Sequence, residues 1–438
     1  MSSDGLAAAV TEIPDRTYFR TPATAPGPSG PDMMRAIGQI RGDPLGFLGT
    51  MRDQHGDVVQ FPIPSPPTYL VSSAAGAQHV LVRNARNYGK QTIQYRSLSL
   101  VTGNGLLTSD GDTWRQQRTV SQPAFNHIQL PDLAAICEEE IAKLVTRWRR
   151  PNRQICVDVE AALLDVTLRV VGRALFGDDL QGRTAALASA TLAALEVVIQ
   201  RSRVPIAIPS FVPSPANRKL KRSMTALEDA VSALVAGRSA TDGEQQLLID
   251  LFLNAGWSAQ EVRDQIVTFL VAGHETVASA CTWALFAIAQ DPLLQVRVGE
   301  TEAHAIQVAA ETLRLYPPAW VVTRQALSPD QIGGFEIPES ALVIVSPYLL
   351  HRDKRYWANP EQFQSDRFAA GTRSQAYLPF GSGARLCIGR DFALLEMRVI
   401  LHRLCQSVVF APTRGQVKAL PGVTLRPGEG LQLMVAPR

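Results

Sequence analysis

Long stretches of this chain place apolar residues at three- and four-residue spacing, the period of an α-helix with one buried face. The clearest run from Asp132 to Arg150 and from Glu160 to Phe176. Shorter stretches rich in β-branched and aromatic residues, bounded by Gly or Pro, predict strands. These are Asp57 to Pro62 and Thr68 to Ser72 as a hairpin, then Phe335 to Ile337, Ala341 to Val345, Val423 to Leu425 and Leu431 to Val435. The pattern predicts a mainly α protein with small β-sheets.

The segment from Gln265 to Gln290 is apolar almost throughout and predicts a helix about 39 Å long. That length suffices to cross a membrane, but His274 and Glu275 at mid-helix would be costly in lipid, and no neighbouring span exists. A buried central helix is the better interpretation. Glu275 and Thr276 stand side by side next to a helix-weakening glycine, which favours a functional site over core polar groups that only satisfy one another.

The composition describes one large domain. No Ser/Gly linker divides the 438 residues, so we expect a single domain over residues 36–438 after an extended Pro-rich segment, residues 1–35. A net charge of +3 gives no reason to expect a nucleic-acid partner. The apolar run Leu6 to Val10 is too short for a membrane anchor. Five scattered cysteines without a CxxC pair argue against disulfides and zinc, and favour a cytoplasmic location.

One cysteine, Cys387, lies in a glycine-punctuated loop that precedes a predicted helix from Asp391 to Leu404. The glycines let the backbone approach a flat ligand, and the helix N-terminus stabilises negative charge on sulfur. A dinucleotide-binding loop is excluded because Leu386 stands where the third glycine of that fingerprint belongs. A lone cysteine so placed suits an axial haem ligand better than a buried small hydrophobe.

The loop sequence Phe-Gly-x-Gly-x-Arg-x-Cys-x-Gly resembles the haem-binding signature of the cytochrome P450 family, with Phe380, Gly381, Arg385, Cys387 and Gly389 at fixed positions. The resemblance implies the cytochrome P450 fold around haem b, with the Cys387 thiolate as the ligand of the iron. Such a thiolate pushes electron density onto the iron and favours O–O cleavage.

The segment Ala272-Gly273-His274-Glu275-Thr276 resembles the distal motif of the same family, Ala/Gly-Gly-x-Asp/Glu-Thr. The resemblance implies that Ala272 lies against the cofactor, that Thr276 hydrogen-bonds dioxygen and that Glu275 helps to relay protons. Val277 replaces a second Thr that many members have at this point.

Two further motifs concern haem binding and folding. Trp114 and Arg118, four apart, match the Trp-x-x-x-Arg motif for the haem propionates, and the resemblance also assigns Arg324 and Arg385 to them. Glu311 and Arg314 resemble the Glu-x-x-Arg helix, whose pair locks with a later arginine, here Arg367; Ser365 stands where Pro is common. We assign these three to folding and haem retention.

The resemblance implies a monooxygenase of the soluble bacterial type, acting on a largely apolar small molecule such as a terpenoid, fatty acid or polyketide. The chain contains no flavin, nicotinamide or iron–sulfur motif, so NAD(P)H acts only indirectly, through a ferredoxin and a ferredoxin reductase. We expect this donor to dock on a basic patch near the cysteine, formed by Arg115, Arg385, Arg390 and Arg398.

By analogy with the family, the substrate pocket draws on residues 95–107, 190–211, 270–276 and 320–322 and on a late turn; the candidates are Tyr95, Leu98, Leu270, Val321, Val322 and Val423. An anionic substrate would use Arg96, Arg201 or Arg203. Two alternatives stay open. One is a non-catalytic haem-thiolate sensor or electron carrier, against which the Glu275–Thr276 pair argues. The other is an atypical catalyst, such as a peroxide-driven oxygenase or a coupling enzyme.

Overall fold

The computed structural model describes residues 24–438 except 64, 127–129, 151–152, 178–189, 191–192, 196, 198–213, 237–246, 372–373, 414 and 429. In this part of the chain the α-helices are α1 (Gly30–Gly42), α2 (Pro44–His55), α3 (Ala74–Gln78), α4 (Ile93–Thr102), α5 (Gly111–Ser121), α6 (Leu130–Trp148), α7 (Val159–Phe176), α9 (Pro215–Ala236), α10 (Leu248–Asn254), α11 (Ala259–Gln290), α12 (Pro292–Glu300), α13 (Glu302–Leu315), α14 (Pro347–Leu350) and α15 (Arg390–Ser407). The short helical turns include η2 (His79–Arg83), η3 (Ala85–Asn87), η4 (Gln122–Phe125), η6 (Ser365–Phe368) and η7 (Gly383–Arg385).

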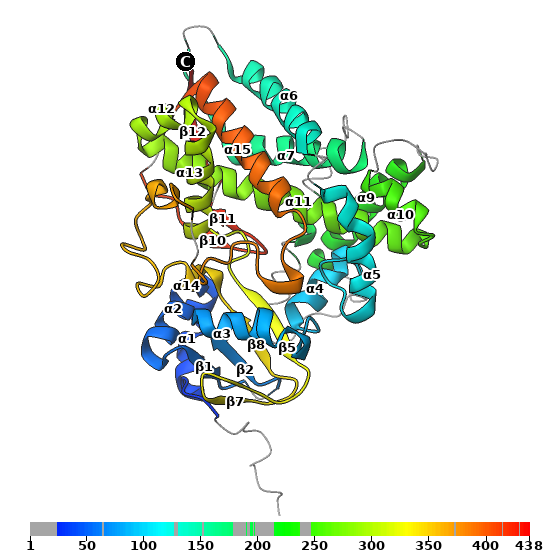
Figure 1. Cartoon of the computed structure of the whole chain (residues 1–438), viewed down its shortest axis with the longest axis vertical. Helices are drawn as coiled ribbons and strands as arrows, with labels where there is room; N and C mark the ends of the chain where they lie inside the picture. The colour runs from blue at the N-terminus through cyan, green and yellow to red at the C-terminus, as the bar shows by residue number, and fades with distance from the viewer. Residues whose placement is uncertain are drawn as a thin grey trace, which may run out of the picture.

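The strands form small sheets beside this helical body (Figure 1). The largest has the order β1-β2-β8-β5-β3, in which β2 and β8 pair in parallel and the other pairs are antiparallel. Its strands are β1 (Val58–Phe61), β2 (Thr68–Val71), β3 (Tyr88–Gly89), β5 (Val322–Ala326) and β8 (Leu342–Val345). The other sheets comprise β4 (Ile155–Asp158), β12 (Gln432–Pro437) and β9 (Val408–Pro412); β6 (Asp330–Ile332) and β7 (Phe335–Ile337); and β10 (Ala419–Pro421) and β11 (Leu425–Pro427). A mainly α fold with small sheets is confirmed.

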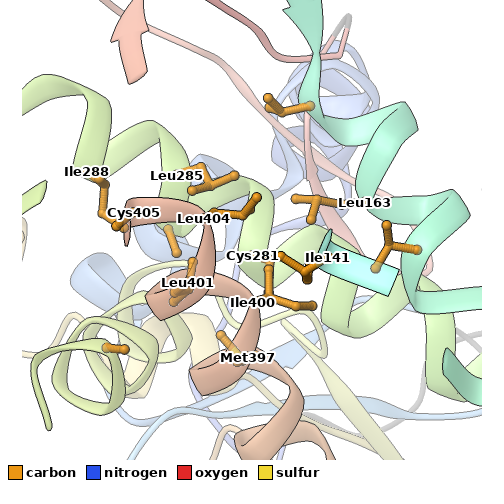
Figure 2. Close-up of a cluster of buried hydrophobic side chains, with 14 of the residues drawn as sticks. Ile141, Leu163, Cys281, Leu285, Ile288, Met397, Ile400, Leu401, Leu404 and Cys405 are labelled. Atoms are coloured by element: carbon orange, nitrogen blue, oxygen red, sulfur yellow. The ribbon is translucent and has the colours of Figure 1, made fainter. Parts of the chain in front are cut away.

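The helix α11 is the centre of the helical body and is buried along most of its length. It packs on α7, α13 and α15. Figure 2 shows one face of this core, where α11 and α15 meet side chains from α6 and α7. Its residues include Ile141, Leu163, Cys281, Leu285, Ile288, Met397, Ile400, Leu401, Leu404 and Cys405. Because α15 follows Cys387 directly, this packing fixes the position of the cysteine loop.

Several predicted boundaries need correction. The central helix begins at Ala259 rather than Gln265, since Ser258 and Glu261 form a capping box before the apolar run. The extended segment predicted for residues 1–35 is wrong for residues 30–35, which belong to α1. There Ser29 and Asp32 form a capping box, and Pro31 fits the first helical turn. Among the described residues, no helix combines the length and hydrophobicity needed to cross a membrane.

The strand predicted from Val423 to Leu425 is also misplaced. Residues 422–424 form a turn, closed by a hydrogen bond from the Gly422 N–H to the Thr424 carbonyl at 3.0 Å. This turn joins β10 to β11, which begins only at Leu425. The glycine after Pro421 ends the first strand, which is too short to produce a periodic pattern of its own.

An ion-pair network centred on the buried Glu311 joins α13 to the segment before the cysteine loop. Arg314 donates two hydrogen bonds to the Glu311 carboxylate, at 2.7 and 2.8 Å, and both side chains are 0% exposed. Arg367 donates to the same carboxylate at 3.0 Å. Arg314 also donates to the carbonyls of His351 and Pro360, at 2.8 and 2.7 Å. The predicted triad therefore exists as geometry, and it holds residues 351–367 against α13.

Removing Arg314 takes two charged hydrogen bonds from the buried Glu311 carboxylate and leaves the partly exposed Arg367 to balance its charge, so the substitution Arg314→Ala is expected to lower the free energy of unfolding by about 3–5 kcal/mol. The matched control is Arg297→Ala, which removes an arginine that pairs with Asp366 at the surface. It should lower that free energy by less than about 1 kcal/mol. Urea unfolding followed by circular dichroism measures both values, and similar losses for the two variants would contradict a structural role for the triad.

Candidate active site

Cys387 lies in the loop between η7 and α15, and its N–H donates to the Phe380 carbonyl at 3.0 Å. Gly381 and Gly383 have positive φ angles of 73° and 69°, a region that favours glycine. At Gly383 a Cβ would lie 2.2 Å from the carbonyl oxygen of Leu81. The turn η2 can therefore pack against this loop only because residue 383 has no side chain.

The environment of the Cys387 thiol combines exposure with close surrounding protein. The side chain is exposed, yet burial raises the pKa of the thiol; the Gly389 N–H and the charges of Arg118 and Arg390 lower it. The sulfur is therefore accessible to a ligand, and the net effect of its surroundings is to raise the pKa of the thiol. Nearby positive charge and a helix N-terminus favour the thiolate form that binds metals.

The helix α5 holds the loop from the other side. Arg118 donates to the Leu386 carbonyl at 2.9 Å, and the guanidinium of Arg385 stacks 3.9 Å from the ring centre of Trp114. Burial lowers the pKa of Arg118, and the Cys387 charge opposes that shift. The structure thus brings Trp114 and Arg118 together with the loop.

Three cations gather in this region with too little negative charge to balance them. Lys90 and Arg324 are each 7% exposed, and the Arg385 side chain is 15% exposed. Lys90 donates to the Leu107 carbonyl at 2.8 Å and Arg324 to the Thr323 carbonyl at 2.9 Å. Within the described residues, the ion pair of this group is the one between Arg385 and Asp110.

This excess of positive charge affects the protonation of the group. Burial and the charges of Arg324 and Arg385 lower the pKa of Lys90 well below its usual range. Burial also lowers the pKa of Arg385 to about 10, although Asp110 opposes the shift. A ligand that carries two carboxylates would supply the missing negative charge.

Lys90 and Asp110 were not among the residues predicted from the sequence. Lys90 follows β3 in an irregular segment without periodicity, where a lysine is normally solvated. Its proximity to Arg324 depends on the β3–β5 pairing, a contact between residues far apart in the chain. Asp110 caps α5 and accepts the Lys90 backbone N–H at 2.6 Å. From the sequence, Asp110 could be identified only as a helix-capping residue, and Lys90 not at all.

In the middle of α11, three positions are partly exposed although their neighbours are buried: Ala272, Gly273 and Thr276. Ala272 and Thr276 share one face of the helix, and the small Ala272 side chain leaves room beside this turn, whereas a Cβ at Gly273 would lie 2.9 Å from Val171 of α7. The Thr276 hydroxyl donates to the Ala272 carbonyl at 2.8 Å. Glu275 is buried beside the β10–β11 turn, where it accepts a hydrogen bond from Thr424 at 2.6 Å.

Four of the six predicted pocket residues belong to one large hydrophobic cluster: Tyr95, Leu98, Leu270 and Val423. The same cluster contains Phe125 and Phe269, whose ring centres lie 5.6 Å apart. Val321 and Val322 pack against two other clusters. Arg96 is exposed, whereas Arg201, Arg203 and most of residues 190–211 lie outside the described residues.

The predicted basic patch is smaller than expected. Arg385 does not belong to it, because this side chain turns inward to Asp110 and Trp114. The Arg115 and Arg390 side chains are 67% and 45% exposed, and each pairs with a nearby aspartate. Arg398 is 29% exposed and pairs with Glu302 at 3.3 Å.

The cytochrome P450 family model matches residues 26–431. The chain belongs to the cytochrome P450 family. This P450 is 32% identical over 426 residues to cyclooctatin synthase of Streptomyces melanosporofaciens, with 90% of each chain covered. It is 28% identical to cyclooctat-9-en-7-ol 5-monooxygenase of the same organism, over 94% of this chain and 92% of the relative. The crystal structure of CYP175A1 from Thermus thermophilus has a TM-score of 0.82 and 32% identity, and the match covers 94% of this chain and all of that chain.

Family membership gives this P450 a haem-iron cofactor, dioxygen as co-substrate and monooxygenase activity. The residues present fit the cofactor. Cys387 is an exposed thiol just before the N-terminus of α15, and the three cations Lys90, Arg324 and Arg385 share one aspartate, so two propionates would supply the missing negative charge. The fold predicted from the sequence is confirmed by the match to a crystal structure over most of both chains.

The excess positive charge predicts opposite effects of Lys90→Met on the stability of the apoprotein and on its affinity for haem. Removing one charge relieves repulsion, so the protein without haem should become as stable as the wild type or more stable. Haem binding should weaken by about tenfold or more, because a charged hydrogen bond to the ligand is lost. Thermal unfolding of the apoprotein and absorbance titration with haemin measure the two effects. Arg398→Met, at a cation already paired with Glu302, is the control; unchanged haem affinity in Lys90→Met would exclude Lys90 from the site.

Proposed function

We propose that this P450 inserts one oxygen atom of dioxygen into a C–H bond or a double bond of a largely apolar small molecule. The observation that carries the proposal is the Cys387 thiol, which is exposed and lies near three cations, Lys90, Arg324 and Arg385, that share one aspartate. The substrate is of the terpenoid, fatty-acid or polyketide type. The electrons come from NAD(P)H through a separate ferredoxin reductase and ferredoxin.

The residues of the site divide into those that bind the iron and those that bind the propionates of haem b. Cys387 would bind the iron, with Phe380, Gly381 and Gly389 shaping its loop, and the partly exposed Ala272 on α11 would contact the cofactor. The side chains for the propionates are Lys90, Trp114, Arg118, Arg324 and Arg385. When bound, haem supplies the reductive activation of dioxygen.

The part of α11 around Thr276 handles protons. Cleavage of the O–O bond consumes two protons, which must arrive while bulk water is kept away. The Thr276 hydroxyl donates its hydrogen bond to the Ala272 carbonyl. The lone pairs of the Thr276 oxygen therefore remain available to accept a hydrogen bond from a donor beside the helix. Glu275 is the acid next to it, and we assign proton supply to Glu275 and proton positioning to Thr276.

The apolar character of the predicted pocket supports the substrate class. Tyr95, Leu98, Leu270 and Val423 belong to one hydrophobic cluster. Val321 and Val322 pack against two other clusters, and their assignment to the pocket rests on the family resemblance alone. One similar protein is named for an unsaturated alcohol, cyclooctat-9-en-7-ol. A compound screen that follows the spin-state change of the haem tests this class; binding of charged compounds alone would contradict it.

The proton-positioning role assigned to Thr276 gives the first functional prediction. The substitution Thr276→Ala should separate electron flow from product formation, so that NAD(P)H consumption continues while hydrogen peroxide replaces most of the product. Thr282→Ala is the matched control, because Thr282 donates to the carbonyl four residues earlier in the same way, at 2.7 Å, but is fully buried. Peroxide and product are measured per NAD(P)H oxidised. Tight coupling in the Thr276 variant would remove this assignment.

The exposed arginines next to the cysteine loop give the second functional prediction, which concerns the electron donor. Charge reversal at Arg115 and Arg390 should slow reduction by an acidic ferredoxin about tenfold at low salt, and the difference should shrink as salt screens the charges. Arg147→Glu on α6 is the control, since Arg147 is similarly exposed and paired with Asp165. Stopped-flow reduction measures the rate. Equal rates for all variants at low salt would place the docking surface elsewhere.

A further inference from the structure

The two oxygens of the Glu275 carboxylate have different surroundings. Oε1 accepts the Thr424 hydroxyl at 2.6 Å and lies 3.8 Å from the guanidinium of Arg426. Oε2 is buried and has no hydrogen-bond partner among the described residues. A carboxylate held by one oxygen while the other stays unpartnered is placed to exchange a proton with a transient partner.

The turn that carries Thr424 is fixed on one face of α11. The Ser279 hydroxyl and the Trp283 indole N–H both donate to the Leu425 carbonyl, at 2.7 and 3.1 Å. Glu275, Ser279 and Trp283 are four residues apart in succession, so they share a face of the helix. Figure 1 shows β11 beside α11 at this point. The contact between Glu275 and the turn is therefore built into the fold.

Arg426 continues from this turn to a second buried carboxylate. Its Nε donates to Glu160 Oε1 at 2.8 Å. Glu160 lies in the first turn of α7, and its side chain is 7% exposed, while that of Glu275 is 5% exposed. The Arg426 side chain is 29% exposed. One arginine thus links the acid of the distal motif to a second acid and to the surface.

The outer carboxylate is buried but lies next to an exposed acid, Asp158. Both acids face Gly430, where a Cβ would come within 3.4 Å of Asp158 and 3.7 Å of Glu160. The exposed Asp158 and the partly exposed Arg426 therefore connect Glu160 to the surface. Burial raises the pKa of Glu160, Arg426 lowers it, and the charges of Asp158 and Glu275 raise it again. Two buried carboxylates that share one arginine favour uptake of a proton by one of them.

We propose that Glu160 is the outer proton-exchange group that resupplies Glu275, and that Arg426 is the positioning residue between them. Glu160 takes a proton from solvent and passes it inward, Glu275 receives it after giving up its own, and Arg426 balances the negative charge on whichever carboxylate is ionised. This inference rests on the proposed role of Glu275. It adds a proton path formed by α7 and the β10–β11 turn.

The test uses the holoenzyme and two readouts. Infrared difference spectroscopy without substrate should show the carbonyl stretch of a protonated carboxyl that disappears in Glu160→Gln. In Arg426→Met that band should persist to higher pH, because the charge that favours ionised Glu160 is gone. Dioxygen consumption driven by NADPH through ferredoxin and its reductase should fall about tenfold or more in Glu160→Gln, with a larger solvent isotope effect. Glu160→Asp should restore much of the rate.

Glu140→Gln is the matched control, because Glu140 is a buried acid bound by Arg173 at 2.8 Å on another face of the protein. If Glu160→Gln and Arg426→Met behave like this control while Thr276→Ala still releases peroxide, the proton path is wrong and the proposed function stands. If Thr276→Ala and Glu275→Gln also behave like the control, the path and the distal assignment both fail.

Discussion

The site depends on one constraint: the sulfur of Cys387 must stay accessible to a ligand while the protein holds its loop in place. The fold meets this constraint by holding a ten-residue loop from three directions. The helix α15 anchors one end in the core against α11, α5 donates a hydrogen bond to the Leu386 carbonyl, and η2 packs against Gly383. The Glu311 network holds the preceding segment against α13. The packing of the core therefore fixes the position of the Cys387 thiol.

The charges around the cysteine loop, rather than its packing, indicate what kind of ligand the site binds. Lys90, Arg324 and Arg385 are buried around one aspartate, an arrangement that destabilises the protein alone and becomes favourable once an anionic ligand binds. On the other side, Glu275 is buried with one oxygen unpartnered. Both features break the usual rule that buried polar groups satisfy one another, and such breaks concentrate at functional sites.

The sequence predicted what short spacing encodes. The long helices, the first hairpin, the cysteine loop, the Trp114–Arg118 face and the Glu311–Arg314 pair follow from local patterns, and the structure has each of them. Lys90, Asp110, Thr424 and Arg426 could not be found in that way. The role of each depends on a contact between residues far apart in the chain, such as the β3–β5 pairing or the packing of the β10–β11 turn on α11. The periodicity of the sequence does not predict such contacts. Arg385, which the resemblance assigned to the propionates, was wrongly placed in the docking patch as well, because its contacts with Asp110 and Trp114 also join distant parts of the chain.

The central claim is that Cys387 binds the haem iron as a thiolate. The most direct measurement is the difference spectrum of the dithionite-reduced holoenzyme with carbon monoxide, recorded for the wild type, Cys387→Ser and Cys156→Ser, whose cysteine is exposed on β4. The wild type and Cys156→Ser should give the strongly red-shifted Soret band of a thiolate ligand, and Cys387→Ser should lose it. A wild-type band typical of histidine or neutral thiol ligation, or an unchanged band in Cys387→Ser, would contradict the claim.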